Sequence, residues 1–271
     1  MSALPLRPLG DTGLNVSPVG LGTVKIGRDQ GVKYPTGFRI PDDQAVRELL
    51  ALAADLGINV VDTAPAYGRS EERLGQLLTH RERWIIVTKV GEEFENGQSR
   101  FDFTPEHVRF SVERSLGRLR TDWLDMVLIH SDGQDLDALN RWGTLDCLLE
   151  LKARGLIRAV GASTKTVAGG LATLEKGDVA MVTRHPGYDD ETPVLDYAAS
   201  HHKGILVKKA LASGHLILRD DPDPVQTALD HAFAHPATGC VILGTINPAH
   251  LRENVEKAGR ALARAGHADQ P

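Results

Sequence analysis

Eight short apolar runs alternate with eight amphipathic segments along the chain, and this alternation restricts the fold more than any other feature. Most of the runs are continuously apolar, which is typical of strands covered on both faces. Strands are predicted at 17–23, 58–62, 85–90, 124–130, 158–163, 179–185, 204–210 and 239–245. Helices are predicted at 42–56, 70–79, 105–119, 137–154, 166–175, 191–202, 222–234 and 248–264.

Regular alternation of strands and helices over this length predicts an α/β protein, a (β/α)8 TIM barrel formed by a single domain, residues 1–271. A doubly wound open sheet could be drawn from fewer strands, and a glycine-rich phosphate loop after an early strand would favour it. No Gly-x-Gly-x-x-Gly pattern occurs, since Gly20-Leu21-Gly22 is not followed by the third glycine. The barrel is therefore the preferred architecture.

Local signals mark several ends of the predicted helices. Asp42, Thr104-Pro105 and Asn247-Pro248 stand where amphipathic segments begin, as capping residues and first-turn prolines do. Gly57 and Gly155 follow the last residues of two other segments, where glycine commonly ends a helix. These signals support the helix boundaries given above.

Two segments lie outside the barrel pattern. Residues 4–16 contain two short apolar stretches around a turn with two glycines, which predicts an N-terminal β-hairpin. Such a hairpin could close the bottom of the barrel. Residues 25–41 are rich in glycine, proline and charge, and they are expected to form a long, mobile loop above the first strand.

The composition excludes several classes of protein. The chain has 271 residues, a hydrophobic fraction of 41% and a formal net charge of -5, which does not suit a nucleic-acid surface. No stretch has the apolar length of a membrane span, and the N-terminus lacks the apolar core of a signal peptide. A cytoplasmic protein is therefore expected. Cys147 and Cys240 are interpreted as reduced thiols of the core, with no metal role.

Four residues with complementary chemistry stand at or just after the ends of three predicted strands: Asp62, Tyr67, Lys89 and His130. In a barrel of parallel strands these ends meet at one mouth, where the active site forms. Each residue alone has a structural interpretation, such as a loop cap, a solvated strand end or a polar rim. Together they favour catalysis, because four mutually useful groups on three strands would be a coincidence.

The four groups can deliver a proton to a carbonyl oxygen. A free tyrosine has a pKa of about 10, and a nearby ammonium such as Lys89 is expected to lower the pKa of Tyr67. Asp62 could hold Lys89 charged and in place, and His130 could orient the carbonyl. Tyr67 would then act as the general acid while a hydride arrives at carbon. The hydride must come from a cofactor, because no side chain can supply one.

Motifs along almost the whole chain resemble those of the aldo-keto reductase superfamily. Leu9–Thr23 is similar to its first hairpin and strand, and Asp62–Gly68 resembles its most specific motif. Gly155–Ser163 resembles its fifth-strand motif, and Gly244–Asn254 resembles the segment that holds the adenosine phosphate. The resemblance implies that Asp62, Tyr67, Lys89 and His130 are the catalytic residues, and that the cofactor is NADPH (NADH is possible) bound without a Rossmann fold.

The resemblance also implies which residues bind the cofactor, with several departures from the family pattern. Thr164 replaces a common asparagine, Thr183 lies where a glutamine is common, and Lys208 replaces an aromatic that stacks on nicotinamide. His250 aligns with an arginine for the 2′-phosphate, which the neighbouring Arg252 could replace. The implied set is Gly22, Thr23, Asp62, Ser163, Thr164, Thr183, Lys208, Ala210, Leu211, Gly244, Thr245, His250, Arg252, Glu253 and Asn254.

The preferred function is NAD(P)H-dependent reduction of an aldehyde or ketone to an alcohol, with a small carbonyl compound as substrate. The expected state is a monomer or weak homo-oligomer without nucleic-acid or membrane partners. One alternative is a nicotinamide-binding regulatory or sensor protein with slow turnover. The departures from the family pattern at Thr164, Thr183 and Lys208 favour this alternative, whereas the four catalytic candidates argue against it. A second is a metal-dependent barrel hydrolase, for which only His130 and His185 stand near strand ends.

Overall fold

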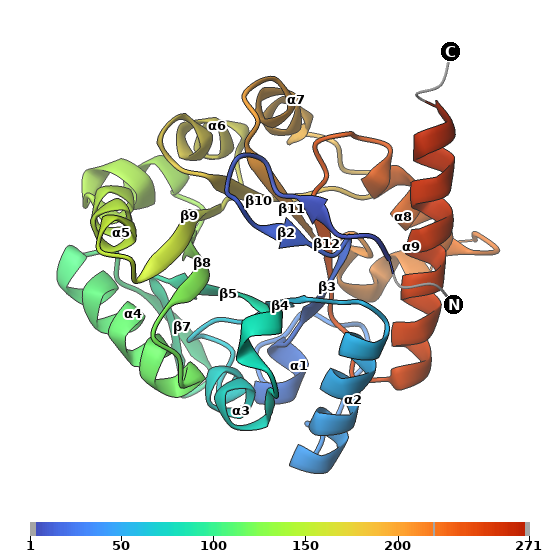
Figure 1. The fold of residues 1–271 in the computed structure, drawn as a ribbon, viewed down its shortest axis with the longest axis horizontal. Coiled ribbons are helices and arrows are strands. Elements are labelled where there is room, and N and C mark those ends of the chain that lie inside the picture. Colours follow the sequence, from blue (N-terminus) through green and yellow to red (C-terminus); the bar gives the residue numbers. More distant parts are fainter. Residues whose placement is uncertain (1–3, 219, 269–271) are drawn as a thin grey trace.

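The computed structural model describes residues 4–218 and 220–268, and its centre is a closed barrel of eight parallel strands (Figure 1). The strands follow one another around the barrel in chain order, and the last pairs with the first. They are β3 Val19–Gly22, β4 Val60–Asp62, β5 Ile85–Val90, β8 Leu124–His130, β9 Ile157–Ser163, β10 Val179–Thr183, β11 Gly204–Lys208 and β12 Cys240–Leu243. The predicted (β/α)8 architecture is confirmed, with all eight strands in the predicted regions.

Alternation of side chains along each strand divides the core into two parts. Ile85 and Val87 of β5 belong to the cluster inside the barrel, whereas Ile86 and Val90 belong to the layer between strands and helices. Lys89 continues the series of Ile85 and Val87, because successive side chains of a strand point to opposite faces. The continuous apolar runs of the sequence therefore reflect burial on both faces.

Helices surround the barrel and connect its strands (Figure 1). They are α2 Asp43–Asp55, α3 Ser70–Leu77, α4 Pro105–Leu119, α5 Thr144–Ala153, α6 Val167–Lys176, α7 Thr192–Ser200, α8 Pro224–Phe233 and α9 Pro248–Ala268. The predicted start signals are confirmed at α2 and α4, where Asp42 and Thr104 accept hydrogen bonds from Ala45 N and His107 N. Within 4–218 and 220–268, no helix is both long and apolar enough to cross a membrane.

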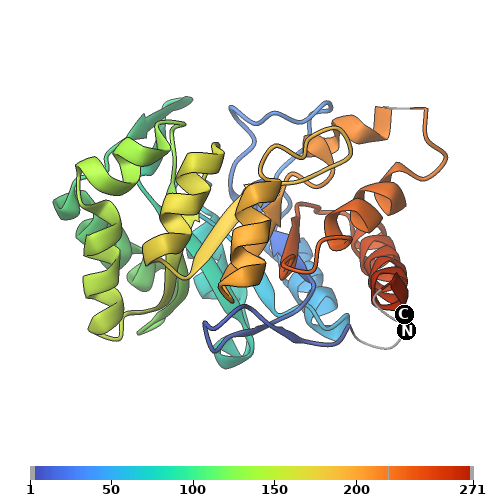
Figure 2. The same cartoon turned by 90° about the horizontal axis from the view of Figure 1, so that it is seen from above.

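The predicted N-terminal hairpin is confirmed and lies at one end of the barrel. Its strands are β1 Arg7–Pro8 and β2 Asn15–Val16, paired antiparallel. Leu9, Leu14 and Val16 are buried in the cluster that fills the barrel interior. Figure 2 shows the dark-blue hairpin at one end of the barrel and the blue loop that precedes α2 at the other. The hairpin therefore closes the end opposite the strand C-termini.

Five local details differ from the predictions. The predicted helix 137–154 is divided into a π-helical turn, Asp137–Arg141, and α5, because Gly143 between them has a positive φ of 69°. The predicted loop 25–41 overlaps a short helix, α1 Val24–Gly27. An unpredicted hairpin, β6 Glu92–Glu95 and β7 Gln98–Phe101, follows β5. Two further unpredicted segments are the 3-10 helices Arg81–Arg83 and Ala212–Leu218.

Both cysteines are buried and unpaired, as the sequence predicts. Cys147 lies in α5 and Cys240 begins β12 inside the barrel. Burial raises the pKa of the Cys240 thiol, so this thiol is held protonated. The two cysteines therefore belong to the core and not to the chemistry of the barrel mouth.

Candidate active site

A cavity of about 1000 Å³ opens at the C-terminal ends of the barrel strands. Its wall includes all four predicted catalytic side chains, those of Asp62, Tyr67, Lys89 and His130. Asp62 ends β4, Lys89 is next to the end of β5, and His130 ends β8. These three strands are neighbours in the barrel, so their last side chains converge on one space.

Lys89 and Asp62 form an ion pair at the floor of this cavity. The ammonium donates to Asp62 Oδ1 at 2.6 Å and to the carbonyl oxygen of Thr63 at 2.8 Å. The side chains are only 1% and 6% exposed. Burial lowers the pKa of Lys89, but Asp62 and Tyr67 together outweigh burial and raise it above its usual value. Lys89 therefore remains an ammonium in the interior.

The backbone that carries Tyr67 is fixed against the end of β3. Thr23 Oγ1 donates to the carbonyl oxygen of Asp62 at 2.8 Å and lies 2.7 Å from Ser70 Oγ. Gly27 of α1 packs so closely that a methyl group on it would lie 2.1 Å from the carbonyl oxygen of Tyr67. This close contact requires glycine and holds the loop after β4 in one place.

The phenol of Tyr67 lies beside the buried ammonium. Lys89 Nζ is 4.8 Å from the centre of the Tyr67 ring. Burial raises the pKa of Tyr67, and Lys89 lowers it, as the sequence argument expected. The net pKa is nevertheless raised above its usual value, because burial outweighs the ammonium. The phenol therefore retains its proton at neutral pH, as a proton donor must.

His130 meets Tyr67 from one side and an unpredicted partner from the other. Its ring lies edge-on to Tyr67, with 6.1 Å between the ring centres. Its Nδ1 lies 2.7 Å from Oε2 of Glu92, the first residue of β6. Sequence reasoning missed Glu92 because it lies in a hairpin that was not predicted. The turn residues Asn96-Gly97, both with positive φ, were the available signal for that hairpin.

Most of the predicted cofactor residues line the same cavity, and three do not. Thr164 is fully buried, the Thr183 backbone N–H donates to Glu191 Oε2 at 2.7 Å, and Arg252 is exposed on α9. The predicted residues in the wall are Gly22, Thr23, Asp62, Ser163, Lys208, Ala210, Leu211, Gly244, Thr245, His250, Glu253 and Asn254. Wall residues that were not predicted include Lys25, Tyr34, Lys165, Lys209, Ser213 and Lys257.

Comparison with known proteins decides the family. The aldo/keto reductase family model matches residues 18–225, which is most of the chain. The chain belongs to the aldo/keto reductase family. Its members are oxidoreductases that use nicotinamide cofactors and act on carbonyl compounds, so the predicted class of reaction, NAD(P)H-dependent carbonyl reduction, is confirmed.

Similar proteins include a galactose dehydrogenase and a methylglyoxal reductase. The chain is 33% identical to L-galactose dehydrogenase of Arabidopsis thaliana over 82% of this chain and 70% of that protein. It is 35% identical to NADH-specific methylglyoxal reductase of Escherichia coli over 58% of this chain and 51% of that protein. A solved candidate aldo-keto reductase from Pseudomonas aeruginosa is 56% identical, covers 95% of each chain and has a TM-score of 0.87.

A lysine at the end of β11 lies in the cavity wall of this aldo/keto reductase. Lys208 ends β11, and its ammonium donates to Ser163 Oγ at 2.9 Å and to the carbonyl oxygen of Thr164 at 2.5 Å. Burial lowers the pKa of Lys208 to about 7, although Glu191 opposes this shift. The structure places its ammonium against two residues that were predicted to bind the cofactor.

Several features of the cavity fit an extended dinucleotide. Gly22 and Gly244 lie side by side, and a methyl group on Gly22 would be 3.5 Å from Gly244 N, so bare backbone forms this part of the wall. The wall ends at the first turns of α9 with His250 and Asn254, where helix amides favour phosphate groups.

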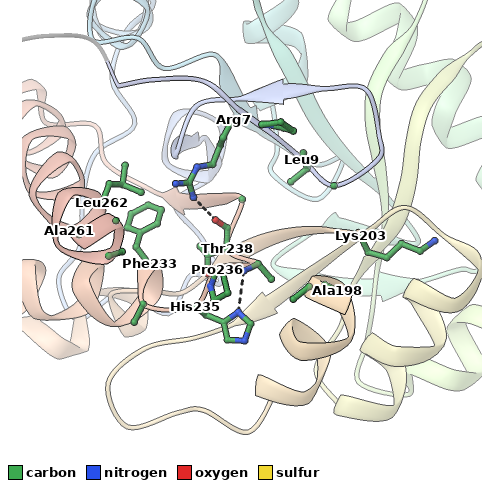
Figure 3. A pocket seen from close by; sticks show the side chains of 18 of the residues that line it. Arg7, Leu9, Ala198, Lys203, Phe233, His235, Pro236, Thr238, Ala261 and Leu262 are labelled. Atoms are coloured by element: carbon green, nitrogen blue, oxygen red, sulfur yellow. Dashed lines mark hydrogen bonds between the residues drawn. The ribbon is translucent and has the colours of Figure 1, made fainter. Parts of the chain in front are cut away.

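A second cavity, of about 700 Å³, lies beside the N-terminal hairpin and has a different character (Figure 3). None of the predicted site residues lines it. Three of its polar side chains already have partners: Arg7 donates to Thr238 O at 2.8 Å, Lys203 donates to Gly177 O at 2.8 Å, and His235 Nε2 lies 3.1 Å from Asp196. This cavity is therefore a packing groove between the hairpin and α7, α8 and α9.

The hydrolase alternative has no candidate ligand set. In the described part of the chain, no three His, Cys, Asp or Glu side chains gather as a metal site would require. His185 packs against Tyr188, with 5.8 Å between the ring centres, and it does not line the cavity that holds His130. The described part of the barrel mouth therefore brings together Asp62, Tyr67, Lys89 and His130 and offers no metal-ligand set beside them.

Proposed function

We propose that this aldo/keto reductase reduces a small aldehyde or ketone, with Tyr67 as the proton donor. The observation that carries the proposal is the buried arrangement of Tyr67 beside the Lys89–Asp62 ion pair at the barrel mouth. A nicotinamide cofactor, when bound, supplies the hydride, which no side chain can provide. The chain supplies the proton and the place in which the carbonyl is held.

Each of the four residues then has a distinct role. Tyr67 holds a proton on its phenolic oxygen and transfers it to the substrate oxygen as negative charge develops there. Lys89 keeps positive charge beside the phenol, which stabilises the phenolate left behind. Asp62 keeps Lys89 charged and fixed by a 2.6 Å hydrogen bond. His130, whose ring stands edge-on to Tyr67, contacts the same substrate oxygen.

We propose NADPH as the preferred cofactor, held along the cavity from Ser163 to Asn254. Thr245 and His250 stand near the first turn of α9 and would surround the 2′-phosphate. Lys257 adds a cation to the same wall, although it is already paired with Glu253 at 2.8 Å. The similar Escherichia coli enzyme is NADH-specific by name, and titration of this chain with both cofactors distinguishes the two preferences.

A two-stage experiment tests the proposed function. The protein is first titrated with NADPH and NADH to measure both dissociation constants. The complex is then mixed with a panel of small aldehydes, ketones and sugars, and single-turnover loss of reduced-nicotinamide absorbance is recorded. Rapid loss with at least one carbonyl supports the proposal. Tight cofactor binding with negligible hydride transfer to every carbonyl would instead favour the sensor hypothesis.

A further inference from the structure

Glu92 is a buried acid at the barrel mouth that the four catalytic residues do not include. It begins the β6–β7 hairpin, which packs on α4 through an ion pair of Glu93 with Arg114 at 2.5 Å. Oε2 of Glu92 lies 2.7 Å from His130 Nδ1, and the two side chains are only 13% and 20% exposed. The imidazole N–H is close to the carboxylate but does not point straight at it.

Neighbouring groups keep Glu92 ionised and in place. Ser99 of β7 donates to Glu92 Oε1 at 2.6 Å. Arg28 lies over the ring of Phe94 in the same hairpin, at 3.3 Å from the ring centre. Burial raises the pKa of Glu92, but His130, Ser99 and Arg28 outweigh burial and lower it to about 2. A full negative charge therefore stands beside Nδ1 of His130 at neutral pH.

This charge determines which ring nitrogen of His130 carries the proton. A neutral imidazole has one N–H, and an adjacent carboxylate favours that N–H at Nδ1. Nε2 then carries a lone pair and accepts hydrogen bonds. Nδ1 is buried against Glu92, and within the described residues Nε2 has no hydrogen-bond partner in the protein. Nε2 is therefore the atom of His130 that is available to a ligand in the cavity.

We propose that Glu92 is a positioning residue that holds His130 with Nε2 as a hydrogen-bond acceptor, and that this matches the site to the hydroxyl group of an alcohol. A neutral acceptor binds a hydroxyl but cannot donate to a carbonyl oxygen. Protonation of His130 turns Nε2 into a donor, which suits the carbonyl form. The inference rests on the proposed function, and it makes the balance between alcohol oxidation and carbonyl reduction depend on pH through Glu92.

The surroundings of His130 set the direction of this dependence. The charged and titratable groups that face it are Glu92 from β6, Lys89 from β5, Lys208 from β11 and the phenol of Tyr67. Burial lowers the pKa of His130, Glu92 raises it, and the two ammonium groups lower it further. The net pKa lies below its ordinary value, so the neutral, hydroxyl-accepting form prevails at neutral pH.

The first test follows His130 by NMR in the protein without cofactor. The chemical shifts of the ring nitrogens identify the tautomer, and a pH titration gives the midpoint of His130 protonation. The His130 signal is the one that is missing from the spectrum of His130→Asn. Glu92→Gln should increase the Nε2–H tautomer and lower the midpoint by about 1–3 pH units, the usual effect of a close opposite charge. Glu92→Asp should restore most of the shift. Glu95→Gln, an exposed glutamate on the same hairpin, should leave both unchanged.

The second test measures kcat/KM for an alcohol and for its carbonyl across pH. In Glu92→Gln, the part of the alcohol kcat/KM profile that reflects titration of His130 should move along the pH axis by the same amount as the NMR midpoint. The KM for the alcohol should rise by a larger factor than kcat falls. An unchanged midpoint in Glu92→Gln overturns the assignment of Glu92. A shifted midpoint with both pH profiles unchanged overturns its role in the reaction. Absence of turnover in the parent enzyme overturns the proposed function and the hydroxyl-matching role together, whereas the NMR result still decides the positioning of His130.

Discussion

The ammonium of Lys89 lies 2.6 Å from Oδ1 of Asp62 inside the barrel mouth, and water is almost excluded from both side chains. Burying two charges is unfavourable unless each has the other as a partner and further hydrogen bonds complete their contacts. The carbonyl oxygen of Thr63, 2.8 Å from the same ammonium, supplies one such bond. Each charge of the pair therefore depends on the other, because removing one leaves the remaining charge buried with its loss of hydration uncompensated.

Asp62→Asn should destabilise the protein as well as inactivate it. The variant leaves the Lys89 ammonium buried without a counter-ion, which costs about 3–5 kcal/mol when one member of a buried pair is removed. Urea unfolding at neutral pH measures this loss. Lys89→Met removes the ammonium that Asp62→Asn leaves unpaired. The double variant Asp62→Asn/Lys89→Met should therefore lose less free energy of unfolding than the two single variants lose in sum. Strictly additive losses would show that the two charges do not interact.

Tyr67→Phe should abolish carbonyl reduction and leave cofactor affinity nearly unchanged. The ring still fills its space beside Lys89, but the proton needed in the transition state is missing. A rate loss of roughly 10²–10⁴-fold is the usual scale for a general acid. Stopped-flow hydride transfer and a cofactor titration measure the two quantities separately. Activity within a few-fold of the parent would remove Tyr67 from the acid role.

Much of the fold could be predicted because its signals are local. The continuous apolar runs identify strands that are buried on both faces, and Thr104-Pro105 defines the start of α4, whose observed bounds Pro105–Leu119 match the prediction. The position of Asp62, Lys89 and His130 at strand ends follows from the same pattern. A parallel barrel brings such ends together whatever the loops do.

The contacts between loops could not be predicted, because they depend on how distant segments meet. Glu92 faces His130 only because a hairpin projects from the end of β5. Lys208 was predicted to bind the cofactor, yet its protein partners are Ser163, which ends a strand two places away in the barrel, and Thr164, the residue after it. The sign of the pKa shift of Tyr67 likewise depended on burial, which sequence spacing does not measure.

Lys208 should make the stability of the protein rise with pH above about 7. Its pKa falls to about 7 on folding, from about 10.5, so between these values the unfolded chain binds the extra proton. The free energy of unfolding then rises by up to ~1.4 kcal/mol per pH unit from this residue. Lys208→Met lacks this contribution. The free energy of unfolding of the parent, measured with urea relative to that of the variant, should therefore increase by about 2–3 kcal/mol from pH 6 to pH 9.

Lys176→Met is the matched control for that measurement. Lys176 lies on the surface, 3.6 Å from Asp146, with a side chain that is 54% exposed. Its removal should leave the pH dependence of the free energy of unfolding parallel to that of the parent. If the difference between the parent and Lys208→Met stayed flat from pH 6 to pH 9, Lys208 would not titrate in this range, contrary to the effect of its burial.

The last prediction concerns the choice between NADPH and NADH at the start of α9. The imidazole of His250 is a weaker phosphate partner than a guanidinium, which donates two parallel hydrogen bonds and keeps its charge. His250→Arg should therefore tighten NADPH by about 1.5–3 kcal/mol, the scale of a charged hydrogen bond, and leave NADH nearly unchanged. Fluorescence titration of both cofactors measures the two dissociation constants. Arg252→Ala should change neither, because Arg252 is exposed outside the cavity wall. Equal tightening of both cofactors by His250→Arg, or a larger effect of Arg252→Ala, would place the 2′-phosphate away from His250.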